Sequence, residues 1–182
     1  MAIMHLFVSI PRVNGSNNCG DGGWASWWSF TTTDAMTVLL VDDDDNSPDV
    51  RSDYIDMITA AGLLYEVYDT QNSNNEPNAA TLQGYPLVIW FTGDEWGGFA
   101  GPGSSGEVAL ASYIDAGGHL VLSSQDYLYD NGLTGFGSSH LGIESFESDE
   151  NQTTVTGSGD LFSELGSVSL NYPFTNYSDV VS

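Results

Sequence analysis

Four short, mainly apolar runs, separated by helical or polar stretches, are the feature that most constrains what this chain can fold into. Residues 37–41 and 86–93 lack the polar alternation of a half-exposed strand, which is typical of strands buried on both faces of a sheet. Two further runs, at 64–69 and 119–124, have the length and composition of strands. We therefore expect four strands.

Segments with helical spacing lie between these strands. One helix is expected from about Ser52, as its N-cap, to Gly62, and a second follows the capping-box sequence from Ser104 to Glu107. The order strand, helix, strand, connection, strand, helix, strand predicts right-handed crossovers and a parallel sheet. We predict an α/β fold, a flavodoxin-like three-layer sandwich with a mainly parallel sheet.

The tail after Leu133 is less regular than this core. Residues 141–143 have the composition of a helix end or a strand fragment. Short β elements are expected near 153–157 and 168–170.

An aromatic segment precedes the first strand. Trp24, Trp27 and Trp28 stand among small residues, which predicts a strand or hairpin. We divide the chain into residues 1–36, an N-terminal β extension or the remnant of a preceding domain, and residues 37–182, the α/β domain. The three rings could form a carbohydrate-stacking face, although a local core or a domain interface uses such residues more often.

The charge of the chain excludes some partners. Among 182 residues, 25 acidic side chains face only Arg12 and Arg51, so the formal net charge is −23. Nucleic acids and anionic membranes are bound through Lys and Arg, and we expect neither as a partner. A lysine-free acidic surface suits a saline or extracellular setting, and an export signal would then precede Met1. Cys19 is the only cysteine, which rules out an intrachain disulfide and a thiolate-rich zinc site.

Polar clusters follow three of the expected strands. Because ligands of open parallel sheets sit beyond the carboxyl ends of the strands, we expect these clusters to share one edge. They comprise Asp42 to Asp45 after the first strand, Thr92, Asp94 and Glu95 after the third, and Ser123, Ser124, Gln125 and Asp126 after the fourth.

A hard-cation site is one interpretation of this edge, since Ca²⁺ and Mg²⁺ prefer oxygen ligands. The candidate ligands are acidic side chains from two loops, and the sequence lacks the spacing of an EF-hand. They are Asp42, Asp43, Asp44, Asp45 and Asp94. The alternative is that these acids cap the next helix or are simply solvated.

A nucleophilic site is a second interpretation. Ser124 stands where a strand-to-helix turn would expose a nucleophile, although the flanking glycines of a nucleophile elbow are missing. His140 is the candidate base, with Asp126 or Asp94 to orient it. Alternatively, Ser124 caps a helix.

Four segments of the chain resemble the class I glutamine amidotransferase-like superfamily, particularly domains attached to secreted multidomain bacterial proteins such as extracellular peptidases. The segments are VLLVDDDDN (38–46), GYPLVIWFTGDEW (84–96), YIDAGGHLVLSSQDYLYD (113–130) and HLGIESF (140–146). The resemblance covers about three quarters of the chain and implies a flavodoxin-like fold.

The resemblance also bears on activity. At the position where active amidotransferases carry a cysteine nucleophile, this chain has Ser124, and no later His-x-Glu completes a triad. It therefore implies an accessory or binding domain whose partners are the neighbouring domains of a larger exported protein. Our leading hypothesis is a non-catalytic domain of this kind, with a divalent cation as its candidate cofactor. The alternatives are a small serine hydrolase and a carbohydrate-binding module.

Overall fold

The computed structural model describes residues 37–71, 75–157 and 162–182. Trp24, Trp27 and Trp28 lie outside the described residues, as does the whole segment 1–36. The division of the chain at residue 36 and the carbohydrate-binding hypothesis therefore stay predictions.

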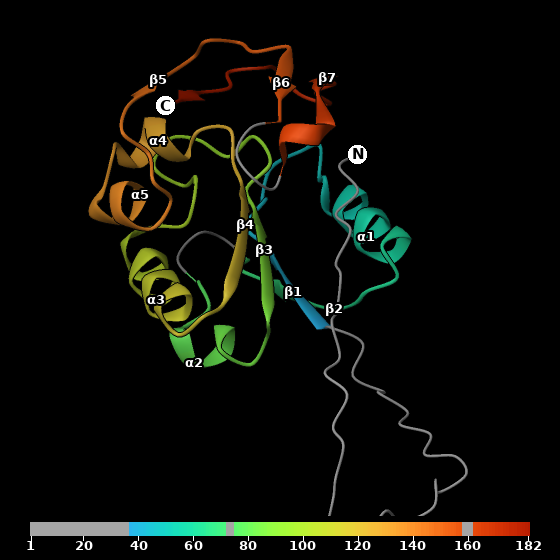
Figure 1. The fold of residues 1–182 in the computed structure, drawn as a ribbon, viewed down its shortest axis with the longest axis vertical. Helices are drawn as coiled ribbons and strands as arrows, with labels where there is room; N and C mark the ends of the chain where they lie inside the picture. The colour runs from blue at the N-terminus through green and yellow to red at the C-terminus, as the bar shows by residue number, and fades with distance from the viewer. Residues whose placement is uncertain (1–36, 72–74, 158–161) are drawn as a thin grey trace, which may run out of the picture.

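Four parallel strands form the central sheet (Figure 1), in the order β2-β1-β3-β4. The strands are β1 (Thr37–Asp42), β2 (Leu64–Asp69), β3 (Leu87–Phe91) and β4 (His119–Ser123). The predicted strands and their parallel pairing are confirmed, with ends that differ by no more than two residues.

Alternate residues of the strands enter two separate cores, as the twofold period of a strand requires. On one face, Leu39, Val41 and Trp90 pack with residues of four helices. On the other face, Leu40 and Phe91 belong to a smaller core. Burial on both faces explains why the first and third strands are apolar without alternation.

Helices cover both faces of the sheet, which confirms the flavodoxin-like three-layer sandwich (Figure 1). Helix α1 (Arg51–Ala60) covers one face through Ile58. The opposite face is covered by α2 (Ala79–Leu82), α3 (Ser104–Asp115), α4 (Tyr127–Asn131) and α5 (Gly135–Ser139). In the described part of the chain, no helix is long and apolar enough to cross a membrane.

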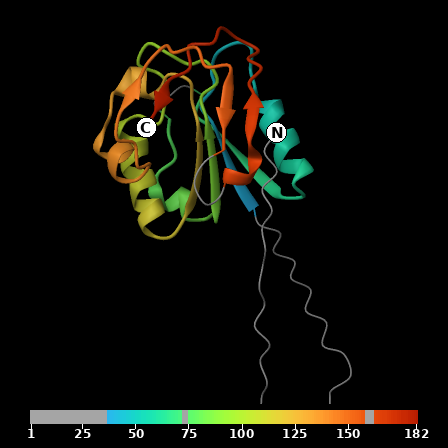
Figure 2. The same cartoon turned by 45° about the horizontal axis from the view of Figure 1, so that its top comes forward.

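The C-terminal region adds two small antiparallel sheets. Strand β5 (Phe146–Glu147) pairs with β8 (Val180–Val181). Strands β6 (Thr154–Thr156) and β7 (Ser167–Ser169) form a second pair, which Figure 2 shows beside α1, and a 3₁₀ turn, η1 (Ser163–Leu165), precedes β7. The short β elements expected near 153–157 and 168–170 are confirmed.

Helix α1 does not begin as predicted. Its N-cap is Val50, and Ser52 lies in the first turn. The first amides are bound by carboxylates from the preceding loop, because Asp44 Oδ2 accepts from Val50 N at 3.0 Å and Asp49 Oδ1 accepts from Arg51 N at 2.8 Å. Two aspartates therefore do what a serine cap would do.

Helix α3 also begins differently, because the predicted capping box does not form. Gly103 is its N-cap, without a side-chain cap of its own. The carboxylate of Glu76, distant in sequence, accepts hydrogen bonds from Gly103 N (2.5 Å), Gly106 N (2.7 Å) and Ser105 Oγ (2.7 Å). A negative charge at this helix terminus also interacts favourably with the helix dipole.

We predict that Glu76→Ala lowers the free energy of unfolding by about 2 kcal/mol, because three donors lose their charged acceptor. Ser104→Ala, in the same turn but exposed, should cost less than about 0.5 kcal/mol. Urea denaturation gives the free energy of unfolding of both variants. Equal effects of the two substitutions would contradict the role of Glu76.

Candidate functional site

The polar clusters that follow β1, β3 and β4 lie together at the carboxyl edge of the sheet. Hydrogen bonds join them, from Thr92 Oγ1 to Ser124 Oγ at 2.7 Å and from Asp45 N to Glu95 Oε1 at 3.1 Å. The edge expected from the sequence is therefore assembled.

Asp43 occupies the point where the strand order reverses, between β1 and β3. Its side chain is fully buried and accepts hydrogen bonds from Trp90 Nε1 at 2.9 Å and Thr70 Oγ1 at 2.8 Å. Burial raises the pKa of Asp43 to about 7. Only glycine fits at position 101, since an added Cβ would lie 1.9 Å from Asp43 Oδ2. The crevice that usually binds a ligand in such a sheet is thus filled by a side chain.

Asp44 and Glu95 are two further buried acids of this edge. An added Cβ at Gly93 would meet the Asp44 carboxylate at 2.5 Å, and Gly93 also has a φ of +55°, so glycine is required there for two reasons. Burial raises the pKa of Asp44 to about 6 and that of Glu95 to about 7.

The predicted cation ligands point to separate partners. Asp42 pairs with Arg51, Asp43 binds Trp90, and the Asp44 carboxylate accepts the amide that opens α1. Within the described residues, no three acidic, histidine or cysteine side chains are arranged to hold a metal ion. One oxygen each of Asp44 and Asp94 is buried without a hydrogen-bond partner. Divalent-cation binding stays a prediction.

Ser124 makes the contact of a helix cap. Its Oγ accepts from Tyr127 N, in the first turn of α4, at 3.1 Å and from Thr92 Oγ1 at 2.7 Å. Asp126, the proposed orienting acid, is buried beside Ser124 in the chain, and burial raises its pKa to about 6.

His140, the predicted base, lies elsewhere. Its Nε2 is 3.3 Å from Oδ1 of Asp115, the last residue of α3, and its ring stacks on Phe136. Asp115 precedes the amino end of β4, whereas Ser124 follows the carboxyl end of that strand, roughly 16 Å away. No hydrogen bond among the described residues joins Ser124 to His140. The serine-hydrolase interpretation stays a prediction without support from this geometry.

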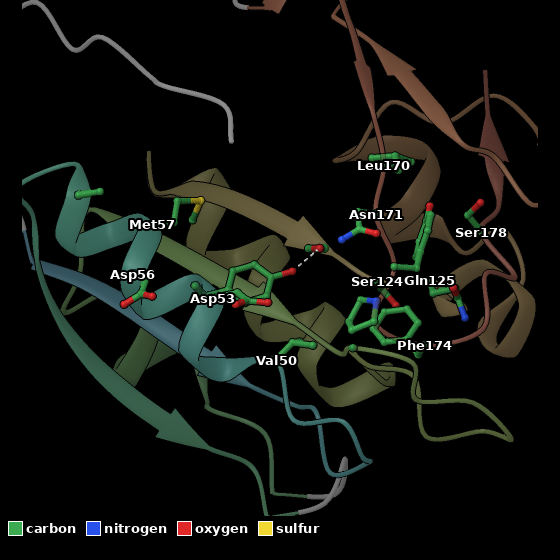
Figure 3. A pocket seen from close by; sticks show the side chains of 16 residues that line it. Val50, Asp53, Asp56, Met57, Ser124, Gln125, Leu170, Asn171, Phe174 and Ser178 are labelled. Carbon is green, nitrogen blue, oxygen red and sulfur yellow. Dashed lines mark hydrogen bonds between the residues drawn. The ribbon is translucent and has the colours of Figure 1, made fainter.

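A cavity of about 660 Å³ opens beside these loops (Figure 3). One wall is α1, with Asp53, Tyr54 and Met57, and the other is the segment 170–174, while Ser123, Ser124 and Gln125 line it from the end of β4. The Tyr54 ring stacks on Phe91 at 4.2 Å, and its hydroxyl donates to Ser123 Oγ at 2.6 Å. These contacts hold the ring in place before any ligand arrives.

The lining of the cavity is mainly apolar, with polar groups at a few points. Phe174 and Tyr172 provide aromatic surface, and Asn171 and Gln125 carry amides. The Gln125 side-chain Oε1 also accepts from Tyr177 N at 3.0 Å, which ties the C-terminal segment to the end of β4. The charged residues of the lining are Asp53 and Asp56, and among the described residues no lysine or arginine contributes to it.

Sequence reasoning placed Ser123, Ser124 and Gln125 at this edge but missed the rest of the cavity. Segment 170–174 has no periodic pattern, and Tyr54 reads as one more core residue of a helix. The aromatic cluster Tyr172-Pro173-Phe174 was the signal that could have indicated a wall.

No protein-family model matches the chain, and no curated protein matches it significantly. The functional interpretation of this site therefore comes from its geometry and its chemistry.

The buried carboxyls predict an unusual dependence of stability on pH. A carboxyl with a raised pKa binds its proton more tightly in the folded chain than in the unfolded one. The stabilisation is complete below the unfolded value near 4, and it is lost as the pH rises through about 7 for Glu95. We expect the melting temperature to fall by several degrees between about pH 5 and about pH 8.

Glu95→Gln, which keeps an acceptor for Asp45 N, should flatten this dependence and raise the melting temperature at about pH 8. The matched control is Glu144→Gln, which removes an equal charge from an exposed position and should leave the slope unchanged. Circular dichroism at constant ionic strength gives the melting temperature of the unsubstituted chain and of both variants at each pH. An unchanged pH dependence in Glu95→Gln would show that folding does not raise the pKa of this carboxyl.

Proposed function

We propose that this chain is a non-catalytic binding domain, which holds a small neutral or cationic molecule with an apolar body in the cavity between α1 and segment 170–174. The cavity is the observation that carries the proposal. Its volume of about 660 Å³ lies in the range of small-molecule sites. It lies at the carboxyl edge of the sheet, the edge at which open parallel sheets bind ligands, but beside the end of β4 and not where the strand order reverses.

The electrostatics of the cavity support a neutral or positively charged ligand. Asp53 and Asp56 line it, and the chain as a whole carries a formal charge of −23. An anionic ligand would enter a negative potential without a basic partner, which disfavours its binding.

The polar groups of the cavity support binding rather than turnover. The Ser123 hydroxyl is bound by Tyr54, and the Ser124 hydroxyl is bound by Thr92 and Tyr127. These hydroxyls have no histidine among their described partners, so they suit fixed hydrogen bonds to a ligand better than nucleophilic attack.

The proposal agrees with what the family resemblance implies. An amidotransferase-like domain without the cysteine nucleophile would act as an accessory module of a larger extracellular protein, and ligand binding is a role that the fold allows. Divalent cations belong to the same proposal as candidate cofactors. Melting curves with Ca²⁺, Mg²⁺ and EDTA test them, and an ion-specific rise that Asp44→Asn abolishes would support them.

A matched series of three probes tests the charge preference. Tyramine, tyrosol and 4-hydroxyphenylacetate share a phenol ring and differ mainly in the charge of the side arm. We expect tyramine to bind best, tyrosol more weakly and the acid not measurably, as seen by calorimetry and by the rise in melting temperature. The reverse order, or binding of none of the three, would contradict the proposal.

A pair of substitutions on α1 locates the binding. Ala60 lines the cavity, whereas its neighbour Ala61 does not, and both are exposed. Ala60→Trp should fill the cavity and weaken tyramine binding at least about tenfold, which is about 1.4 kcal/mol. Ala61→Trp should leave the affinity within about twofold. Equal affinities of the two variants would place the ligand elsewhere.

A further inference from the structure

Three exposed aromatic rings that the proposed function does not use lie outside the lining of the cavity. Trp96 and Phe99 belong to the loop between β3 and α3, and Tyr129 belongs to α4. Their exposed fractions are 66%, 50% and 56%. We call these three residues the aromatic edge. Large aromatic side chains are more often buried, and a group of them at the surface indicates contact with a partner.

Hydrogen bonds hold the loop of the aromatic edge against α4. The Asp130 carboxylate accepts from Gly97 N at 3.1 Å and from Ala100 N at 3.0 Å, and Asn131 Nδ2 donates to Ala100 O at 2.9 Å. Gly97 follows Trp96, Ala100 follows Phe99 and Asp130 follows Tyr129, so the segments that carry the three rings are tied together at Asp130. A surface fixed in this way loses little entropy on binding, which favours recognition.

The charge around the aromatic edge is negative. Asp94 lies two residues before Trp96, and Asp130 directly follows Tyr129. The exposed Asp45 lies on the adjoining loop, whose Asn46 side chain donates to Asp94 O at 3.3 Å. Aromatic faces next to carboxylates attract guanidinium and ammonium groups through cation–π and Coulomb interactions.

A second copy of this chain cannot readily supply the cation. The whole sequence has two basic side chains, Arg12 and Arg51, and Arg51 is already paired with Asp42 and Asp69. We therefore expect the complementary charge to come from outside this sequence. We propose that the aromatic edge docks a lysine- or arginine-bearing segment of a partner protein, and that Trp96 and Phe99 are its main contacts.

Three labelled decapeptides test this proposal by their binding to the full chain. In each peptide, glycine alternates with one other residue, which is lysine, glutamine or glutamate. Fluorescence anisotropy in about 0.15 M NaCl gives the affinities. The lysine peptide should bind at least about tenfold more tightly than the glutamine peptide, and the glutamate peptide should not bind. Equal binding of the lysine and glutamine peptides would overturn the proposal.

Paired double variants separate the aromatic edge from the general attraction of an acidic protein for a basic peptide. The double variant Trp96→Ser with Phe99→Ser should bind the lysine peptide about fivefold or more weakly, because two rings are lost. The matched control, Tyr65→Ser with Val108→Ser, removes two exposed side chains of β2 and α3 and should change the affinity less than about twofold. All three proteins have the same net charge.

Equal affinities in the two double variants would overturn the proposal. So would binding of cellohexaose that is lost in Trp96→Ser with Phe99→Ser while peptide binding is unchanged, because the rings would then be a glycan platform. If melting shows that this double variant is unfolded, the single variant Trp96→Lys replaces it. The new positive charge should repel the lysine peptide and lower its affinity at least about fivefold. An unchanged affinity would overturn the proposal.

Discussion

The carboxyl group of Asp43 lies fully buried where the strand order of the sheet reverses, held by the Trp90 indole and the Thr70 hydroxyl. The rest of the carboxyl edge depends on this arrangement. It joins the ends of β1, β2 and β3, and it requires glycine at position 101 for the loop that leads into α3. It also fills the crevice that a parallel sheet of this order normally offers to a ligand. The open space is found instead between α1 and the C-terminal segment.

Burial of several acids at one edge has an energetic consequence. A charged carboxylate in such a place loses its hydration, and this burial raises the pKa values of Asp43, Asp44 and Glu95. The acidity of the chain therefore has two parts. Exposed carboxylates give it a strongly negative surface, whereas the buried ones act as hydrogen-bonding groups that fix the loops around the cavity and the aromatic edge.

The sequence was sufficient for the sheet but not for the helix starts. Strands such as 37–41 are buried on both faces, so their apolar runs are unambiguous. The cap of α3 escaped prediction because its acceptor, Glu76, is distant in sequence. Helix α1 is capped jointly by Asp44, six residues before Val50, and by the local Asp49, and not by Ser52. Local propensity cannot anticipate a cap that tertiary structure supplies.

The candidate site was predictable only where it follows from the topology of the sheet. The carboxyl edge follows from parallel topology, which places Ser124 near Thr92. His140 could not be placed, because its position depends on how α5 packs along α3, toward Asp115. The far wall of the cavity comes from segment 170–174, which has no periodicity to read.

The central claim is that a ligand enters the cavity beside α1 and not the crevice closed by Asp43. An NMR titration of the isotope-labelled chain with tyramine tests it directly. The account predicts that the largest chemical-shift changes occur at the backbone amides of Ser123, Gln125 and Phe174. The chemical shift of the Trp90 indole N–H should not change. If the largest chemical-shift changes were at the Trp90 indole and the Thr70 amide, they would contradict the account, because the ligand would then be displacing Asp43 from the crevice.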